Sequence, residues 1–528
     1  MASLPVIVAA VRGVSDGWFP YGDRAVIATR AIDVLTVDTP LLGQYSASSD
    51  LTGEPTYSLG PLLYWLLALP ARIGADALAV TVAALNVAAV VGAVALARRR
   101  GGLPLMFATA AATAVMCGSL GAETFHEVWN PAVGVLPLLA LVFLCWSIAC
   151  GERELLPLAV LVASFLAQAH LTFALPAAGL IAVAAAGLTL ARRWTRRAGL
   201  GAIGVTAVCW SLPLIEQAIH RPGNLVRVAR AAGERGPTLG AGDGWSALSH
   251  TVGAPPWWLR APRSPFERLS DLANGRGALA TIVTVAILLG LLAVAAAGAR
   301  RRRADLVAAG AIGLLLCAAI FAGTAGTPGR SYQSVTYSLY WASPAGMAAW
   351  LLLGWGAAVS LAARRDRGRA REAPRPPGGL RAAAPALALA CTALAGLAVG
   401  LAADRDEDRA KYDPLRATTA RLHERLGGAG RVAVEASDTD PAFDFATATV
   451  YRLRREGAPV ASRQLSHLLG SRYDEPGRPL RVHDRAAGRP PPGTLLATGT
   501  VRRTIGLGFP PRPTPVTERV DAILGPAP

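Results

Sequence analysis

The chain is organised around residues 15–61, which read SDGWFPYGDRAVIATRAIDVLTVDTPLLGQYSASSDLTGEPTYSLGP. This stretch is polar, although apolar segments lie on both sides of it. It interleaves acidic and aromatic side chains, namely Asp16, Asp23, Asp33, Asp38, Asp50 and Glu54 with Trp18, Tyr21, Tyr45 and Tyr57. Carboxylates and aromatic rings gathered in one loop of an apolar protein indicate a site for a polar, sugar-like substrate.

The composition of the whole chain is that of a membrane protein. Of its 528 residues, 52% are hydrophobic and only 16% are charged, which is too apolar for an ordinary soluble enzyme. The net charge of +17 could indicate nucleic-acid binding. However, the arginines form short clusters beside apolar segments, which membrane topology explains better. We therefore expect a multi-pass protein of the plasma membrane that binds membrane lipid and no nucleic acid.

The cysteines do not indicate a metal centre. All six lie in or beside apolar segments, without a CxxC pair: Cys117, Cys145, Cys150, Cys209, Cys317 and Cys391. Neither a zinc site nor a disulfide framework follows from this pattern, so we interpret them as small core residues.

Apolar runs predict about eleven transmembrane helices. The first run, residues 1–14, is short, so it is either a short helix or the end of a helix that starts upstream. Residues 62–73 are also too few to span a bilayer and predict a helix at its interface. The other runs are residues 76–97, 104–121, 130–150, 155–170, 173–191, 199–215, 276–298, 305–325, 341–363 and 381–402.

The arginine clusters predict the orientation of these helices. Residues 98–100, 192–197, 300–303 and 364–371 are rich in arginine and fall in alternate loops, which the positive-inside rule assigns to the cytoplasm. The opposite, outer side then receives the acidic loop, the turn 122–129, the long loop 216–275, the turn 326–340 and everything after residue 402.

These assignments divide the chain into a transmembrane domain, residues 1–402, and a soluble outer domain, residues 403–528. Residues 15–75 form the first outer loop with its juxtamembrane helices. In the soluble domain we expect helices at 414–426 and 441–456 and strands at 431–436, 480–483 and 494–498. The expected fold class is an α-helical polytopic membrane protein with a small outer α/β domain.

Asp23 and Asp16 are the candidate catalytic residues. Both follow the first membrane segment closely, where the backbone is well fixed, and glycosyl transfer needs a carboxylate near the attacking hydroxyl group. The alternative for Asp23 is a capping role at the helix that begins near Arg24.

Further candidate substrate-binding residues lie in the other outer segments. Glu123, His126 and Glu127 could supply a base, a phosphate-binding histidine or metal ligands, or could cap the next helix. His170, beside Gln168, is expected to face a polar cavity or to bind a neighbouring helix. Arg221, with Arg227 and Arg230, could bind a lipid-linked phosphate or carry solvated charge. Trp257 and Trp258 form an interfacial anchor or a stacking platform, and Tyr332, Tyr337, Tyr340 and Trp341 line the cavity or form an aromatic belt.

Taken together, these features resemble the GT-C superfamily of polytopic glycosyltransferases, and most closely its actinobacterial membrane members of the arabinofuranosyltransferase and mannosyltransferase type. The stretches that carry the resemblance are WFPYGDRAVIATRAIDV, TPLLGQYS, GPLLYWLLALPARIG, EVWNPAVGVLPLLAL, LPLIEQAIHRPGNL and PPWWLR. They cover roughly the first half of the chain. In such proteins an acidic residue near the start of the first outer loop serves the transfer, and this role falls on Asp23, with Asp16 second.

The resemblance implies transfer of a sugar from a polyprenyl-phosphate donor to a glycan or lipid acceptor of the cell envelope, on the outer face of the membrane and with either stereochemical outcome. The need for a divalent cation stays open. Two other classes of function compete with it. A transporter of lipid-linked glycan would need charges and broken helices within its spans, and the spans here are nearly free of Asp, Glu and Lys. A non-catalytic protein could instead bind cell-wall glycan through residues 403–528.

Overall fold

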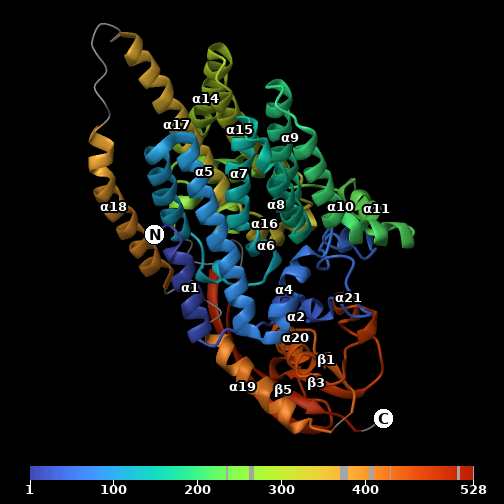
Figure 1. Ribbon diagram of the computed structural model, residues 1–528. Helices are drawn as coiled ribbons and strands as arrows, with labels where there is room; N and C mark the ends of the chain where they lie inside the picture. The colour runs from blue at the N-terminus through green and yellow to red at the C-terminus, as the bar shows by residue number, and fades with distance from the viewer. Residues whose placement is uncertain are drawn as a thin grey trace.

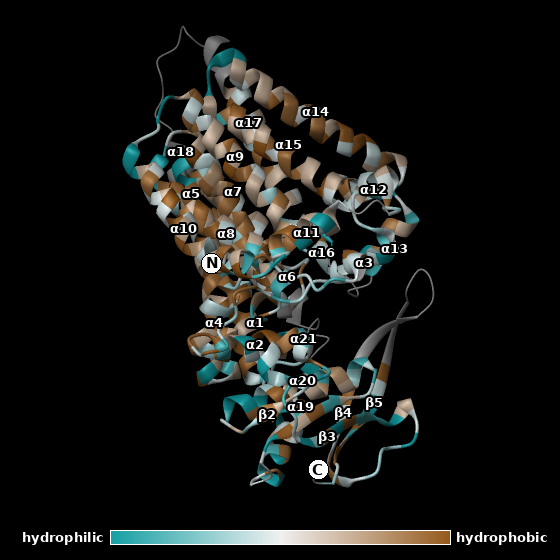
Figure 2. Cartoon of the chain, turned by 90° about the vertical axis from the view of Figure 1, so that its right-hand side faces the viewer, coloured by the Kyte–Doolittle hydropathy of each residue, from teal (hydrophilic) through white to brown (hydrophobic). Residues whose placement is uncertain are grey.

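The computed structural model describes residues 1–233, 236–260, 267–368, 378–403, 409–428, 430–507 and 512–526. Figure 1 shows a bundle of long helices with a smaller domain of strands and helices below it, at the end where the C-terminus lies. Figure 2 shows that apolar residues dominate the bundle, whereas the smaller domain mixes polar and apolar residues. The polytopic helical fold with a small C-terminal α/β domain is therefore confirmed.

The helices follow one another in chain order with short connections. The N-terminal part contains α1 (Leu4–Ser15), α2 (Gly22–Asp33), α3 (Ser49–Thr52), α4 (Leu62–Ile73), α5 (Ala75–Cys117), η1 (Ala122–Phe125), α6 (Asn130–Val133), α7 (Val135–Ala149), α8 (Leu156–Ala169), η3 (Leu171–Phe173), α9 (Ala174–Leu190) and α10 (Arg196–Ile219). The central part contains α11 (Asn224–Ala232), α12 (Gly240–Val252), η4 (Trp257–Leu259), α13 (Glu267–Asn274), α14 (Ala278–Arg301), α15 (Ala304–Ala325), η5 (Gly329–Ser334), α16 (Val335–Ser338), α17 (Ala342–Gly368) and α18 (Gly378–Ala403).

Within the described residues, seven helices are long and apolar enough to cross a membrane, so the expected count of about eleven is not confirmed. Part of the difference is α5, a single element of 43 residues. It is kinked at Gly101 and Gly102, where Gly102 has φ +66°, a conformation that glycine adopts readily. The two halves match the runs 76–97 and 104–121. The predicted spans at the N-terminus and 155–170 correspond to helices of 12 and 14 residues. The predicted span 381–402 lies within α18, a helix of 26 residues, in which the apolar segment with described side chains is Pro385–Gly400.

The bundle has a buried centre and an apolar outer surface. Every residue of α7 from Val135 to Ala149 is buried, because α5, α8, α9 and α15 surround this helix. The outer helices α10 and α14 instead expose large apolar side chains, such as Ile203 and Ile282, which are 65% and 64% exposed. Such surfaces are stable in contact with lipid tails rather than water.

The arginine-rich turns lie together at one end of the bundle, as their alternation predicted. The α9–α10 and α14–α15 connections are at the top of Figure 1, opposite the C-terminal domain. Contacts join the turns of this end, since Arg99 pairs with Glu152 at 3.3 Å and the Trp146 indole donates to the Asp305 carbonyl at 3.0 Å. Which compartment this end faces stays a prediction.

The C-terminal domain is built on a five-stranded mixed sheet. Its elements are α19 (Arg409–Arg425), β1 (Val432–Ala436), α20 (Asp440–Arg455), β2 (Val460–Ala461), α21 (Ser466–Leu469), β3 (Arg478–Asp484), β4 (Thr494–Leu507) and β5 (Arg512–Leu524), with the strand order β2-β1-β3-β5-β4. Strand β1 pairs in parallel with β2 and β3, whereas β5 is antiparallel to β3 and β4. The expected helices and three strands are present, and β2 and β5 are additional.

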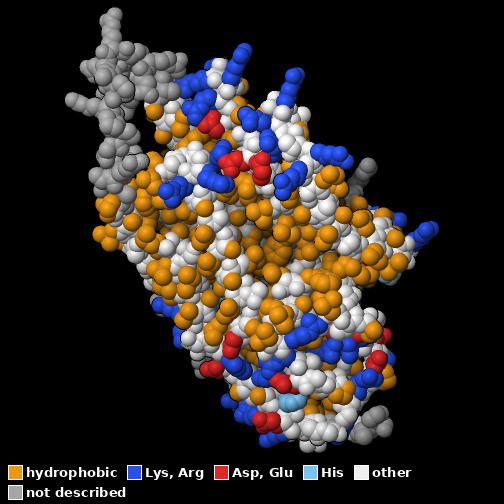
Figure 3. Space-filling view, in the orientation of Figure 1, with side chains coloured by type: hydrophobic (Ala, Val, Ile, Leu, Met, Phe, Trp, Pro, Cys, Tyr) orange, Lys and Arg blue, Asp and Glu red, His pale blue; other side chains and the backbone are white. Residues whose placement is uncertain are grey.

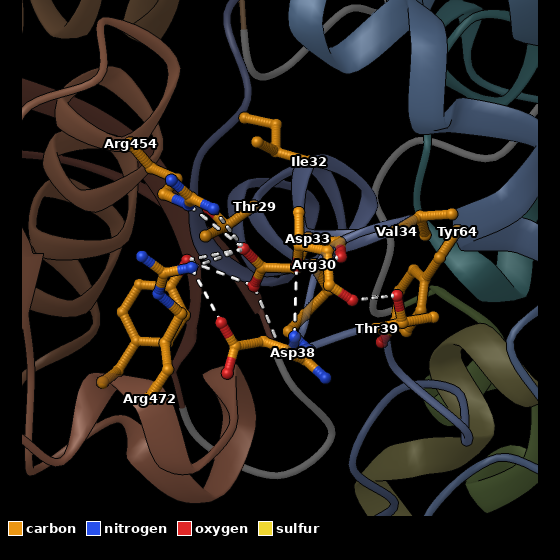
Figure 4. Close-up of polar contacts among 12 residues, drawn as sticks. Thr29, Arg30, Ile32, Asp33, Val34, Asp38, Thr39, Tyr64, Arg454 and Arg472 are labelled. Carbon is orange, nitrogen blue, oxygen red and sulfur yellow. Dashed lines mark hydrogen bonds and ion pairs between the residues drawn. The ribbon is translucent and has the colours of Figure 1, made fainter.

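This domain packs directly on residues 15–75. Helix α20 lies against α2, and Phe19, Val26 and Tyr451 belong to one buried core that crosses the junction. At the end of α2, the Asp33 carboxylate is fully buried between Arg30 at 3.2 Å and Arg454 at 3.0 Å (Figure 4). Sequence analysis did not predict this contact. Through this contact, the C-terminal domain fixes the position of α2, the helix that carries Asp23.

Candidate active site

Asp23 lies in the wall of a cavity of about 610 Å³. This cavity is enclosed by residues of the loop 15–61, η3, the start of α9, the end of α15 and the segment 326–341. Its lining combines polar and aromatic groups with an apolar wall, and includes Asp23, Gln44, Tyr45, Ser46, Ser48, Trp129, Asn130, His170, Thr172, Leu175, Ile320, Thr324, Tyr337 and Trp341. A cavity of this size and composition is large enough for a sugar and part of a lipid chain.

Helix α2 presents Asp23 to this cavity from its first turn. The preceding Tyr21 is extended, and Gly22 has φ +53°, so the chain turns sharply before the helix begins. The Asp23 carboxylate makes no capping hydrogen bond to the helix backbone. It accepts instead from the Gln44 amide at 3.4 Å and from the Trp129 indole at 3.3 Å. Its orientation is therefore set by side chains of two other segments.

A buried ion pair contacts the aromatic rings next to Asp23. Arg24 pairs with the carboxylate of Glu127, and its guanidinium group stacks on the rings of Tyr21 and Trp129, at 4.9 and 5.0 Å from their centroids. Glu127 does not line the cavity. It acts on the site indirectly, because it holds the arginine that covers the Trp129 ring.

His170 faces the same cavity from the start of η3. Its Nδ1 atom accepts a hydrogen bond from the Thr172 backbone N–H at 3.3 Å, and its ring meets the ring of Tyr337 edge-on at 5.9 Å. With Nδ1 accepting, the neutral ring carries its proton on Nε2, which can donate to a ligand. The neighbouring Gln168 is buried and joins helices instead, since it donates to the Cys209 carbonyl at 2.7 Å.

Three other predicted residues lie elsewhere. Asp16 pairs with Arg409 at 2.7 Å, at the junction with the C-terminal domain. His126 is fully buried against Gly13 and Trp18, and this burial lowers the pKa of its imidazole to about 4. Arg221 is exposed. The side chain of Glu123 lies outside the described residues. The side chains of Asp16, His126 and Arg221 are not among those that line the Asp23 cavity.

The paired tryptophans form a separate structure. The Trp257 ring stacks on His250 with 5.1 Å between centroids, and its indole donates to Asp271 at 2.6 Å. Trp258 lines a different, apolar cavity of about 480 Å³ with Leu279 and Trp350. Neither ring lines the cavity that contains Asp23.

Several residues of the site were not singled out by sequence analysis. Gln44 and Trp129 bind Asp23, and Tyr45, Ser46 and Ser48 add polar groups from the first outer loop. Gln44 and Trp129 belong to the stretches LLGQYS and EVWNP of the sequence. Their contacts with Asp23 depend on the folding of the chain, so the sequence alone does not show them. Over the described residues, no group of three or more His, Cys, Asp or Glu side chains could hold a metal ion.

Comparison with known proteins gives a structural match only. No protein-family model matches the chain, and no curated protein matches its sequence. The structure is similar to the crystal structure of ArnT from Cupriavidus metallidurans bound to undecaprenyl phosphate, with a TM-score of 0.50 and 12% identity over 98% of this chain and 96% of that one. It also aligns with the apo oligosaccharyltransferase of Archaeoglobus fulgidus, with a TM-score of 0.35 and 13% identity over 84% of this chain and 63% of that one. The ArnT match extends over nearly the whole of both chains, and it confirms the GT-C-like fold that the sequence resemblance predicted.

Proposed function

We propose that this protein transfers a sugar from a polyprenyl-phosphate donor to a glycan or lipid acceptor of the cell envelope. The reaction takes place in the Asp23 cavity, on the outer face of the membrane. The observation that carries this proposal is the position of one carboxylate, Asp23, held by two side-chain donors in a cavity with both a polar and an apolar wall.

Glycosyl transfer to a hydroxyl group requires a base such as this carboxylate. An acceptor hydroxyl group attacks the anomeric carbon of the sugar while the bond from that carbon to the phosphate oxygen breaks. The bonding electrons leave with the polyprenyl phosphate. The proton of the attacking hydroxyl passes to the Asp23 carboxylate, which increases the nucleophilicity of the oxygen in the transition state. The Gln44 and Trp129 donors keep the carboxylate oriented for this transfer.

The walls of the cavity suit the two ends of a lipid-linked sugar. Tyr337, Trp341 and Trp129 offer aromatic faces to a sugar ring. Leu175, Ala319 and Ile320 come from helices α9 and α15 and supply an apolar surface for the lipid chain. His170 also lines the cavity, with its ring 5.9 Å from that of Tyr337, and its Nε2–H can donate to the phosphate or to a sugar hydroxyl. The polyprenyl carrier is also favoured by the shared fold, because the ArnT structure holds undecaprenyl phosphate.

The cavity favours inversion at the anomeric carbon. Retention by double displacement needs a second carboxylate, or another nucleophile, to form a covalent sugar intermediate. Asp23 is the only carboxylate among the described residues that line the cavity. A single displacement, with Asp23 as the base, is therefore the simpler mechanism, and the anomeric configuration of the product reports on it directly.

The test uses purified full-length protein in proteoliposomes, supplied with polyprenyl-phosphate sugars and envelope acceptors. We expect release of polyprenyl phosphate and formation of a glycosylated acceptor of inverted configuration. Asp23→Asn removes the base and should lower turnover at least 100-fold, within the usual range for general base catalysis. The matched control is Glu54→Gln, an acid of the same loop that is half exposed and lies 3.9 Å from Arg230.

Two results would contradict the proposal. Full activity of Asp23→Asn would remove this carboxylate from the mechanism. Movement of intact lipid-linked sugar across the liposome membrane, without transfer, would instead assign the protein to the transporters.

A further inference from the structure

A second, smaller cavity of about 210 Å³ lies at the junction of the C-terminal domain with the membrane domain. Helices α19 and α20 form one side of it, and the connection from α4 to α5 forms the other. Its lining consists of Phe19, Ile73, Gly74, Ala75, Asp76, Ala77, Arg416, Arg452 and Arg455. It shares no lining residue with the Asp23 cavity, and the proposed transfer makes no use of it.

Positive charge dominates this junction cavity. Its lining contains three guanidinium groups but one carboxylate, Asp76, which is 3.8 Å from Arg416. Arg452 and Arg455 both pair with the same oxygen of Glu456, outside the lining. Burial, and then the neighbouring charge of Arg455, lower the pKa of Arg452. Crowded guanidinium groups of this kind are typical of sites that bind phosphate.

The backbone adds to this charge. Residues Ala75 to Ala77 of the lining form the beginning of α5, an element of 43 residues, and Gly74 is its N-cap. The first N–H groups of a helix have no partner within it and carry a partial positive charge, which favours an anion nearby. The positive lining therefore has contributions from three side chains and from a helix terminus.

The cavity also lies at the edge of the apolar surface. On α4, the exposed side chains Trp65, Leu69 and Ile73 recur every four residues and form one apolar face, with Leu69 and Ile73 each 68% exposed. Val80, near the start of α5, is also exposed. Figure 3 shows the same boundary, where the hydrophobic band of the bundle meets the charged surface of the C-terminal domain. Lipid headgroups lie at the edge of the apolar layer of a bilayer, so a cationic cavity at the edge of an apolar protein surface is suited to them.

We infer that the junction cavity binds the phosphate headgroup of an anionic phospholipid in the leaflet that faces the C-terminal domain. Arg416, Arg452 and Arg455 hold the phosphate, and the acyl chains lie along the apolar face of α4. A lipid fits better than free phosphate, since Ile73 is both part of the lining and part of that apolar face. The bound lipid then joins the C-terminal domain to the membrane surface.

The test measures lipid affinity of the full-length protein in detergent by native mass spectrometry. Phosphatidylglycerol and phosphatidylcholine with identical acyl chains are titrated separately. We expect wild type to prefer phosphatidylglycerol. The double variant Arg416→Gln/Arg455→Gln should weaken phosphatidylglycerol binding about 25-fold, since each arginine at a membrane surface contributes about fivefold. Phosphatidylcholine binding should not change.

Three controls make the result specific. Arg463→Gln/Arg481→Gln removes one exposed and one partly exposed arginine of the same domain, which pair with Asp474 and Glu435, and should leave the preference intact. Arg416→Lys/Arg455→Lys keeps the charge and should keep the preference. Lack of a preference in wild type, equal loss in the Arg463/Arg481 variant, or equal binding of inorganic phosphate alone would each overturn the inference. The wild-type comparison stands even if the double variant does not fold.

Discussion

The orientation of the Asp23 side chain is set by residues that lie far from it in the sequence. Trp129 and Gln44 donate hydrogen bonds to the carboxylate. The guanidinium group of Arg24, which pairs with Glu127, stacks on the Trp129 ring. The sequence singled out Asp23 because it follows a membrane segment closely, and the structure places it in the wall of the cavity; its catalytic role stays a prediction. The sequence could not show that Trp129, 106 positions away, completes the site, since that contact depends on how the helices pack.

The Trp129 hydrogen bond predicts a specific kinetic effect. Trp129→Phe keeps an aromatic ring beneath Arg24 but removes the indole N–H that binds Asp23. Since hydrogen bonds to charged groups are worth about 2 kcal/mol, we expect kcat for sugar transfer to fall at least tenfold with thermal stability nearly unchanged. The control is Trp194→Phe, whose indole binds Thr189 at the arginine-rich end. Equal activity of both variants would show that Asp23 does not need this donor.

His126 predicts a pH dependence of stability. Burial lowers its pKa to about 4 in the folded protein, whereas the unfolded chain has the ordinary value of about 6.5. Between these values the unfolded state binds more protons, so stability falls as the pH falls, by up to about 1.4 kcal/mol per pH unit. We expect the loss of thermal stability between pH 7 and pH 5 to be smaller in His126→Gln than in wild type. Parallel pH profiles of the two proteins would contradict this assignment.

At the scale of elements, α2 is held at both ends. Its first turn carries Asp23 into the cavity, and its last residue, Asp33, binds the C-terminal domain through Arg454 and the Tyr473 hydroxyl group. The sequence predicted α20 and three strands of that domain, because their periodicity is clear. It missed β5, since Pro513 and Pro515 argue against a strand, and it missed the docking on α2, because the partners are more than 400 residues apart.

This docking predicts a large effect of Asp33→Asn. The substitution leaves the guanidinium groups of Arg30 and Arg454 without their buried carboxylate, at a cost of about 3 kcal/mol. Asp38→Asn is the matched control, since Asp38 makes one partly exposed pair with Arg472 at 2.8 Å and should cost less than about 1 kcal/mol. Thermal unfolding and limited proteolysis of the C-terminal domain measure the difference. Equal stability of the two variants would show that the Asp33 cluster does not hold the domain.

At the scale of the whole molecule, the alternation of arginine clusters was the most informative feature of the sequence. It placed four arginine-rich loops at one end and the first loop and C-terminal domain at the other. The structure has the α9–α10 and α14–α15 turns at the end opposite the C-terminal domain (Figure 1), whereas residues 369–371 of the fourth loop lie outside the described residues. The number of spans was harder to predict, because apolar composition alone does not distinguish a spanning helix from a short one packed in the bundle, such as α8.

The orientation in the membrane can be tested with two matched cysteine variants. Arg489→Cys places a thiol on the exposed surface of the C-terminal domain, and Arg193→Cys places one in the arginine-rich α9–α10 turn, where the side chain is also exposed. A membrane-impermeant maleimide applied to intact cells should label position 489 and not position 193 until the membrane is permeabilised. The reverse pattern would put the Asp23 cavity on the cytoplasmic side.

The initial rate of polyprenyl phosphate release from a saturating lipid-linked sugar donor tests the central claim most directly. The account predicts that wild type and Glu54→Gln release the carrier at equal rates while Asp23→Asn is at least 100-fold slower and still binds the donor. Equal rates for all three proteins, or no release by any of them, would contradict a transfer reaction driven by Asp23.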